Sequence, residues 1–328
     1  MNKQVSYQLN KIIKKTSDKN LNNHILVAIS GGQDSLYMIK LIEDLIRQYT
    51  KQKNNQINIS YIYVDHQWRK DSYKQTIHVI NYIRCIERAI YIYQLPKNIL
   101  SENLSRVYRY HIITKHAIKY KNKLIVTGHN QTDKIETFLY NFFRGSGTQG
   151  TTSLTLQTKI NNHMYLLRPL LNLRRDIIYW TCKRFNLPIW SDTSNYIYDF
   201  HRNRTRYELI PYIKKYFNSN IEGNLNSLLK NYYKDNEYIK QNTIKLYLIS
   251  KHPKYIAINH HKLRKQNLTL QFKVIQLFCI HNLNFSLRYN KILEILIHIN
   301  KKLKYINIKI KLQSMTLHID KKWMYVTL

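Results

Sequence analysis

Several residue types are scarce in this chain of 328 residues, and each scarcity argues against a class of protein. Only 5 prolines and 7 glycines accompany a hydrophobic fraction of 44%, which favours a packed globular chain over a disordered one. The 3 cysteines, Cys85, Cys182 and Cys279, lie far apart without a C-x-x-C motif, which argues against a zinc ribbon, an iron–sulfur cluster or a disulfide framework. No apolar run approaches the ~20 residues that cross a bilayer, so we expect no membrane partner.

Acidic residues are also few, since 19 Asp and Glu stand against 53 Lys and Arg, for a net charge of +34. Such an excess favours a polyanionic partner, because each phosphate that a protein neutralises releases a condensed counterion. A basic surface that only keeps the protein soluble is the alternative. The many Lys, Asn, Ile and Tyr residues have A/T-rich codons, and no targeting peptide is visible. We therefore expect a plastid (chloroplast) protein encoded in the organelle, with the bacterial cytoplasm as the alternative.

The first two thirds of the chain alternate between strand and helix patterns. Strands are expected at His24–Ser30, Ile57–Val64, Ala89–Leu95 and Lys123–Gly128, and helices at Asp34–Tyr49, Ser72–Ala89, Glu102–Tyr120 and Gln131–Arg144. This order predicts an α/β fold, a doubly wound and mostly parallel sheet of the Rossmann-like kind. In such sheets ligands bind at the carboxyl ends of the strands.

From about Ile221 the pattern changes. Helices are expected at Glu222–Ser250, Asn267–His281 and Tyr289–Asn300, and the tail Lys304–Leu328 alternates as short strands. We predict two domains, a larger α/β domain over residues 1–220 and a smaller α+β domain over residues 221–328. No proline or glycine linker marks the boundary, so its position is the least defined part of this prediction.

A phosphate-binding loop is expected between the first strand and the first helix, where the sequence reads Ser30-Gly31-Gly32-Gln33-Asp34-Ser35. Two glycines let the backbone approach an anion closely, and the helix N-terminus that follows directs amide donors at it. The serines add hydroxyl donors, and Asp34 could position Mg²⁺. A glycine turn followed by a helix cap is the plainer alternative. The string is not a Walker A motif.

A second glycine-rich segment, Gly145–Gly150, matches G-x-G-x-x-G but follows a helix instead of a strand. A dinucleotide-binding fold requires that motif directly after a strand. We therefore interpret this segment as a mobile loop near the site and not as a cofactor motif.

The Ser30–Ser35 loop resembles the PP-loop of ATP pyrophosphatases, which cleave ATP between the α and β phosphates and transfer AMP. Further segments resemble, in order, the motifs of the tRNA(Ile)-lysidine synthase family. They are Val64–Arg69, Glu102–Tyr110, Thr127–Thr137 with Arg144–Gly147, Arg168–Leu171, Asp192 with Asn195, and Arg202–Arg206. The resemblance covers about residues 22–217, and several motifs in order are far more specific than one.

The resemblance implies a two-step reaction with ATP as co-substrate and Mg²⁺ as cofactor. ATP adenylates the C2 oxygen of the wobble cytidine in the CAU-anticodon isoleucine tRNA and pyrophosphate leaves. The ε-amine of free L-lysine then displaces AMP to give lysidine, which changes codon reading from AUG to AUA. The implied partners are that tRNA and lysine, and the assembly state is open, with a homodimer among the alternatives.

The expected helix from Gln131 carries a polar stripe. At 100° per residue Asp133, Glu136, Tyr140 and Arg144 share one side, and the apolar residues Ile135, Phe138, Leu139 and Phe142 share the other. This predicts a helix with one buried face and a polar face turned outward, either toward a site or merely toward solvent. The amine of lysine, with a reference pKa near 10.4, needs a group that holds it and takes its proton. Asp133, Glu136 and His129 are the candidates.

Other charged residues also receive expected roles, with plain surface charge as the alternative for the arginines. Asp65 would serve the nucleotide or the metal, and Arg106, one helical turn from Arg109, would clamp a phosphate or the activated base. The residues expected to bind tRNA are Arg144, Arg202, Arg204 and Arg206. Lysines that alternate with apolar residues in the tail predict a basic sheet face that follows tRNA phosphates.

The chain departs from the family's motifs at several positions: Tyr63 stands for His, Gln67 for Gly, Asn130 for the second His and Thr132 for the first Asp. These changes affect the expected lysine contacts more than the activity, since Asp65, His129, Asp133 and Glu136 remain. A PP-loop tRNA thiolase is an alternative, although Cys85 and Cys182 lie outside every motif. A catalytically inactive tRNA-binding protein is the other.

Overall fold

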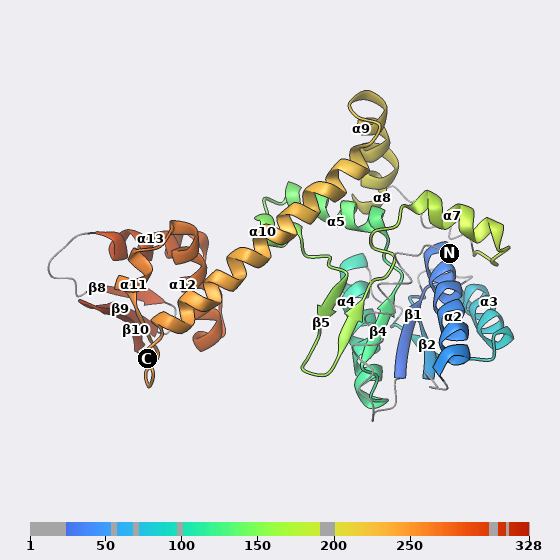
Figure 1. The fold of residues 1–328 in the computed structure, drawn as a ribbon, viewed down its shortest axis with the longest axis horizontal. Helices are drawn as coiled ribbons and strands as arrows, with labels where there is room; N and C mark the ends of the chain where they lie inside the picture. The colour runs from blue at the N-terminus through green and yellow to red at the C-terminus, as the bar shows by residue number, and fades with distance from the viewer. Residues whose placement is uncertain are drawn as a thin grey trace. The chain divides into compact units, whose positions relative to one another are not determined.

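The computed structural model describes residues 24–53, 58–67, 72–96, 101–190, 201–301, 308–312 and 315–327. The chain divides into two compact units, Met1–Leu229 and Lys230–Leu328, so the division falls inside helix α10 (Ile221–Ser250) (Figure 1). The predicted boundary at residue 220 lies nine residues earlier and stays a prediction. Each unit has a hydrophobic core of its own.

The first unit is built on a six-stranded sheet in the order β3-β2-β1-β4-β6-β5. Its strands are β1 (His24–Ile29), β2 (Asn58–Asp65), β3 (Ala89–Gln94), β4 (Leu124–Thr127), β5 (Gln157–Lys159) and β6 (Tyr165–Leu167). All neighbours pair in parallel except β5 and β6, which are antiparallel. Strand β1 pairs with β2 on one side and β4 on the other, so the chain order reverses beside it. The predicted mostly parallel α/β sheet is confirmed.

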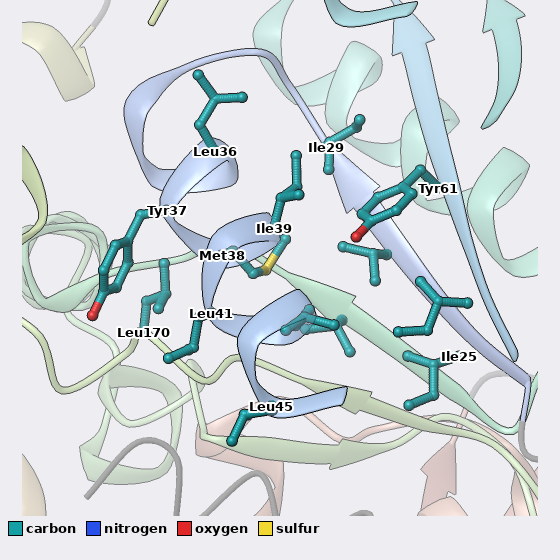
Figure 2. Packing of buried hydrophobic residues seen from close by; sticks show 14 of the residues in the cluster. Ile25, Ile29, Leu36, Tyr37, Met38, Ile39, Leu41, Leu45, Tyr61 and Leu170 are labelled. Atoms are coloured by element: carbon teal, nitrogen blue, oxygen red, sulfur yellow. The ribbon is translucent and has the colours of Figure 1, made fainter. Parts of the chain in front are cut away.

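Helices cover both faces of this sheet. The helical elements of the first unit are α2 (Gln33–Lys53), α3 (Ser72–Cys85), α4 (Glu102–Lys119), α5 (Gln131–Phe143), α6 (Thr148–Thr151), α7 (Arg175–Arg184), α8 (His201–Arg204), the π-helical turn η2 (Thr205–Leu209) and α9 (Ile210–Tyr216). Helix α2 packs its apolar side on β1 and β2, where Leu36, Met38 and Tyr61 are almost fully buried (Figure 2). A second cluster joins the opposite face of the sheet to α4 through Ile113 and Ala117.

The predicted elements of the first unit form with ends shifted by at most four residues. The sequence analysis predicts neither the short strands β5 and β6 nor the helices from α6 to α9, of which all but α7 are seven residues long or shorter. These pieces matter for function, because α8 and η2 bring arginines back to α5 across more than 60 residues of sequence.

The second unit is a four-stranded antiparallel sheet in the order β7-β10-β9-β8 with helices packed on it. Its elements are β7 (Ala257–Asn259), α11 (His260–Arg264), α12 (Leu268–Leu283), α13 (Tyr289–Asn300), β8 (Ile308–Leu312), β9 (Met315–Ile319) and β10 (Trp323–Thr327). The predicted alternation holds in β8, where Lys309 and Lys311 are exposed and Ile310 is buried. Within the described residues, no helix is both long and apolar enough to span a bilayer.

Candidate active site

The loop between β1 and α2 has the conformation that an anion-binding turn requires. Gly31 has φ +76°, and a Cβ at that position would lie 2.8 Å from a methyl of Val79, so only glycine fits. The Ser35 hydroxyl donates to the Gly32 carbonyl at 2.8 Å, and the Gln75 side-chain amide donates to the Ser30 carbonyl at 2.8 Å. The loop is therefore held from α3 as well as from its own helix.

Asp34 lies at the first turn of α2 beside the loop. Its Oδ1 atom is buried without a hydrogen-bond partner. Burial and the nearby Asp133 charge raise the pKa of Asp34 to about 6. An unpartnered carboxylate oxygen beside a phosphate-binding loop fits a cation that arrives with a nucleotide. The described residues hold no cluster of three His, Cys, Asp or Glu side chains that could hold a metal. The single carboxylate of Asp34 beside the loop suits Mg²⁺, which binds one or two carboxylates and completes its coordination shell with water and phosphate oxygens.

His129 follows the carboxyl end of β4. Its Nδ1 atom lies 3.0 Å from the Thr127 hydroxyl. Burial, together with the charges of Arg106, Arg168 and Arg109, lowers the pKa of His129 to about 3 against the opposing effect of Asp133. The imidazole is therefore neutral at physiological pH and is a weak base for an ammonium proton.

Two carboxylates of α5 and two arginines from α8 and η2 form a charge quartet, consisting of Asp133, Glu136, Arg202 and Arg206. Arg202 donates from Nη2 to Asp133 Oδ1 and from Nε to Glu136 Oε2, both at 2.6 Å. Arg206 donates from Nε to Glu136 Oε1 at 2.5 Å and from Nη2 to Asp133 Oδ1 at 3.1 Å. Two positive and two negative charges thus neutralise each other in a largely buried position.

Asn130 fixes the first carboxylate of this quartet. It is the N-cap of α5: its Oδ1 accepts from the Asp133 backbone N–H at 3.0 Å, and Asp133 Oδ2 accepts from the Asn130 N–H at 2.9 Å. Burial by itself would raise the pKa of Asp133, but Arg202 and Arg206 outweigh it and hold that pKa at about 2. Asp133 is therefore ionised, and every bond it makes is to a neighbour in the fold.

A pocket opens at the carboxyl ends of β1, β2 and β4, the position that the topology predicts for a ligand. Its walls combine the loop, one side of α4 and the start of α5. The lining includes Ser30, Asp34, Ser35, Arg106, Arg109, Tyr110, Thr127, Gly128, His129, Asp133 and Arg202. Phosphate-binding, cationic and anionic groups thus meet in one place, which suits ATP-dependent activation of a polar substrate.

Comparison with known proteins identifies the family. Residues 1–213 match the family model of the PP-loop domain. The chain is 46% identical over 303 residues to the chloroplastic tRNA(Ile)-lysidine synthase of Gracilaria tenuistipitata var. liui, covering 92% of each chain. It is 34% identical to the chloroplastic tRNA(Ile)-lysidine synthase of Pyropia yezoensis, with 98% of this chain and 96% of that protein covered. The chain belongs to the tRNA(Ile)-lysidine synthase family.

Among solved structures, the U34-tRNA thiolase NcsA of Methanococcus maripaludis superposes with a TM-score of 0.51 at 16% identity, covering 69% of this chain and 79% of that one. At this identity the likeness bears on the fold alone. It agrees with the PP-loop fold of the family.

Five of the family motifs, Ser30–Ser35, Val64–Arg69, Glu102–Tyr110, Thr127–Thr137 and Arg202–Arg206, each contribute at least one residue to the pocket lining, whereas Arg144–Gly147 and Arg168–Leu171 contribute none. Asp65 ends β2 but does not line the pocket: its Oδ1 accepts from the Gln67 N–H at 2.9 Å and its Oδ2 from the Ser72 hydroxyl at 3.3 Å. It joins the end of β2 to Ser72, the first residue of α3, and its predicted role toward nucleotide or metal stays a prediction. Asp192 and Asn195 lie outside the described residues.

The predicted polar face of α5 is wrong in part. Asp133 and Glu136 are buried instead of turned outward, because arginines from a distant segment neutralise them. Phe142, expected on the buried side, is exposed at the end of the helix. The other residues follow the prediction: Ile135, Phe138 and Leu139 are buried, and Tyr140 and Arg144 are exposed, with the guanidinium of Arg144 over the Tyr140 ring.

The four arginines expected to bind tRNA fall into two pairs. Arg202 and Arg206 contact the carboxylates of α5, whereas Arg144 and Arg204 are exposed to solvent. Arg204 forms an ion pair with Glu208 at 3.1 Å on the surface. The tRNA contacts of all four stay predictions. The segment Gly145–Gly150 forms a turn and the start of α6, and none of its residues lines the pocket.

Sequence reasoning missed Gln75, which holds the PP-loop from α3. A signal was present, because Gln75, Val79 and Ile83 are spaced by four and share the buried face of that helix. A polar residue within a buried stripe indicates a side chain with a specific partner. It also missed the capping role of Asn130.

Proposed function

We propose that this chain converts the wobble cytidine of the CAU-anticodon isoleucine tRNA to lysidine, using ATP and free lysine. In the first step the C2 oxygen of the cytosine attacks the α-phosphorus of ATP, and pyrophosphate leaves. In the second the lysine ε-amine attacks C2, and AMP leaves with that oxygen. The observation that carries this proposal is the pocket that joins the PP-loop to the charge quartet, in a chain of this family.

The PP-loop and Asp34 support the nucleotide end of the reaction. The loop amides and the N-terminus of α2 would bind the phosphates. Mg²⁺ would be held by Asp34 and the phosphates, and would neutralise charge on the departing pyrophosphate. Arg106 and Arg109, which both line the pocket from α4, would bind the phosphate or the activated base.

The charge quartet supports the lysine end, with one change from the expected contacts. Asp133 and Glu136 already accept bonds from two arginines, so a lysine ammonium must compete with them. Arg202 is the more exposed of the two and lines the pocket, so we propose that it moves or takes the lysine carboxylate. A carboxylate with a pKa near 2 would hold the ammonium by charge and would not remove its proton.

Two substitutions test this division of roles. Asp34→Ala should abolish pyrophosphate release and leave tRNA affinity nearly unchanged, because loss of one preorganised contact costs ~10²–10³ in rate. Near-normal turnover would remove the PP-loop assignment.

Asp133→Asn should raise the KM for lysine by a larger factor than the factor by which it slows pyrophosphate release. If adenylated tRNA does not form in that variant, Asp133 belongs to the first step.

We further propose a plastid location, supported by the chloroplastic relatives and by the A/T-rich residue usage. A thiolase activity has less support. Cys182 lies close to the PP-loop, donating from Sγ to the Gln33 carbonyl at 3.5 Å, but it is buried and does not line the pocket. Burial also raises the pKa of its thiol to about 11, so the nucleophilic thiolate is scarce at neutral pH.

A further inference from the structure

Helix α9 carries a group of exposed aromatic side chains that the reaction described above does not use. Tyr212, Tyr216 and Phe217 are 55%, 61% and 75% exposed. The rings touch one another, with centroids 4.9 Å apart for Tyr212 and Tyr216 and 6.0 Å apart for Tyr212 and Phe217. We call these three residues the α9 aromatic cluster. Contiguous exposed apolar surface of this kind commonly marks an interaction site.

The cluster is tied to the active site through the helix that precedes it. Turn η2 runs directly into α9, and Arg206 of that turn bonds Glu136 and Asp133 in the quartet. In Figure 1, α9 projects from the end of the first unit at which α5 and α8 lie. Because α5 begins just after the carboxyl end of β4, this is also the end of the sheet at which the pocket opens.

Charge at the cluster favours an anionic partner. Lys215 lies over the Tyr216 ring, 4.9 Å from its centroid. Lys214 forms an ion pair with Glu222 at 3.1 Å, so of the two lysines it is Lys215 that adds charge beside the rings. Aromatic rings beside a cation are the arrangement on which single-stranded nucleic acid stacks its bases, while the cation meets the backbone.

We propose that the α9 aromatic cluster stacks unpaired bases of the tRNA anticodon loop, next to the base that enters the pocket. The inference rests on the proposed function, since the base to be modified must itself leave the anticodon loop to reach the pocket. Sequence-specific recognition of RNA uses such unstacked loop bases, and aromatic side chains bind them through their faces. The cluster would then hold the loop open beside the site and contribute affinity for the tRNA without touching ATP.

The first test compares binding of two RNAs by the full-length protein: a hairpin that reproduces the anticodon arm and a plain duplex with the same stem. The variant is Tyr212→Leu/Tyr216→Leu, because leucine preserves the helix and removes both rings. We expect it to bind the hairpin about tenfold or more weakly, with an unchanged salt slope and unchanged duplex binding. Lys215→Gln should instead lower the salt slope for the hairpin by somewhat under one unit.

Tyr238→Leu is the matched control, since Tyr238 is 71% exposed on α10, and it should leave hairpin binding unchanged. Equal affinity of wild-type and double variant for the hairpin would overturn the inference. So would an equal loss for the duplex, because a duplex has no unpaired loop bases for the rings to stack on. A difference in molar mass in solution between the wild-type protein and the double variant would show that the cluster joins two copies of the chain. That result would also overturn the inference.

A second measurement needs no substitution and no catalysis. Photo-crosslinking of wild-type protein to a hairpin with 5-iodouridine in its loop should label a peptide that contains Tyr212, Tyr216 or Phe217. Crosslinks confined to other peptides would contradict the inference. Absence of lysidine from a wild-type reaction would refute the proposed function, whereas these binding experiments report on the cluster separately.

Discussion

Asn130 determines the orientation of Asp133, because each of the two residues caps the other at the start of α5. Asn130→Ala should lower the free energy of unfolding by about 1 kcal/mol, since the buried Asp133 N–H loses its acceptor. Asn130→Ser should cost much less, because serine is an equally good N-cap. Chemical denaturation of the three proteins measures the difference. Equal losses in both variants would show that the cap contributes little here.

The three cysteines should differ sharply in reactivity. Cys85 is exposed, whereas Cys182 and Cys279 are buried. Burial raises the pKa of the Cys182 thiol to about 11 and that of Cys279 to about 12, so neither forms thiolate at pH 8. We expect a thiol reagent to modify Cys85 rapidly in the native protein and the other two only after unfolding. Peptide mapping after a short exposure to the reagent measures the labelling of each cysteine. Rapid labelling of Cys182 would contradict its burial beside the PP-loop.

The charge quartet joins η2 to α5 and should contribute strongly to the stability of that contact. Arg206→Met leaves Glu136, whose side chain is 2% exposed, with Arg202 as its remaining partner in the quartet. Removing one partner of a buried pair usually costs several kcal/mol, and we expect about 2–3 kcal/mol because Arg202 remains.

Arg204→Met is the matched control on the neighbouring α8, since Arg204 and Glu208 form an exposed pair. It should change the free energy of unfolding by less than about 0.5 kcal/mol. If both variants lose the same amount of stability, the quartet is not a buried network. Adding Glu136→Gln to Arg206→Met should recover part of the loss, because no buried charge is then left uncompensated.

The same quartet predicts a pH dependence of stability. The pKa of Asp133 is lowered from 3.8 to about 2 in the folded protein. A carboxyl whose pKa is lowered contributes stability that is present above its unfolded pKa and is lost as the pH falls through its folded pKa. The free energy of unfolding should therefore fall between about pH 4 and pH 2. Asp133→Asn should flatten the curve in that window. Identical slopes in both proteins would contradict the pairing.

A truncation series tests the predicted domain boundary at residue 220, because α5 contacts residues of α10 beyond it. The Gln131 side chain donates to the Glu222 carbonyl at 3.3 Å, Lys134 donates to Asn226 at 2.9 Å, and Leu229 is buried. A chain that ends after Asn236 should therefore stay soluble and bind ATP, whereas one that ends after Asn220 should be markedly less stable. Thermal denaturation and nucleotide binding compare the two.

The chain that ends after Asn236 also tests the predicted role of the second unit in tRNA binding. It should bind tRNA more weakly and with a shallower salt dependence, because Lys309 and Lys311 are exposed side by side on one face of the sheet. Each lost phosphate contact should lower the log–log slope by somewhat under one unit. An unchanged slope would assign tRNA binding to the first unit alone.

Much of the fold could be predicted because its signals are local. The apolar run Ile25–Ile29, the glycines after it and the periodicity of α2 each lie within one short window, and together they predict a strand, an anion-binding turn and a helix. The family could likewise be predicted from the order of its motifs, Ser30–Ser35, Thr127–Thr137 and Arg168–Leu171, because motif order is a property of the sequence alone.

The chemistry of the candidate site was decided by contacts between distant segments. A helical wheel places Asp133 and Glu136 on the polar side of α5 and leaves open whether that side faces a site or solvent, because the wheel does not show which segment packs there. In the folded chain, two arginines from about 70 residues away compensate those charges, so the carboxylates are buried and ionised. No local pattern encodes that pairing. It exists only because α8 and the η2 turn bring the guanidinium groups of Arg202 and Arg206 within hydrogen-bond distance of the carboxylates of α5.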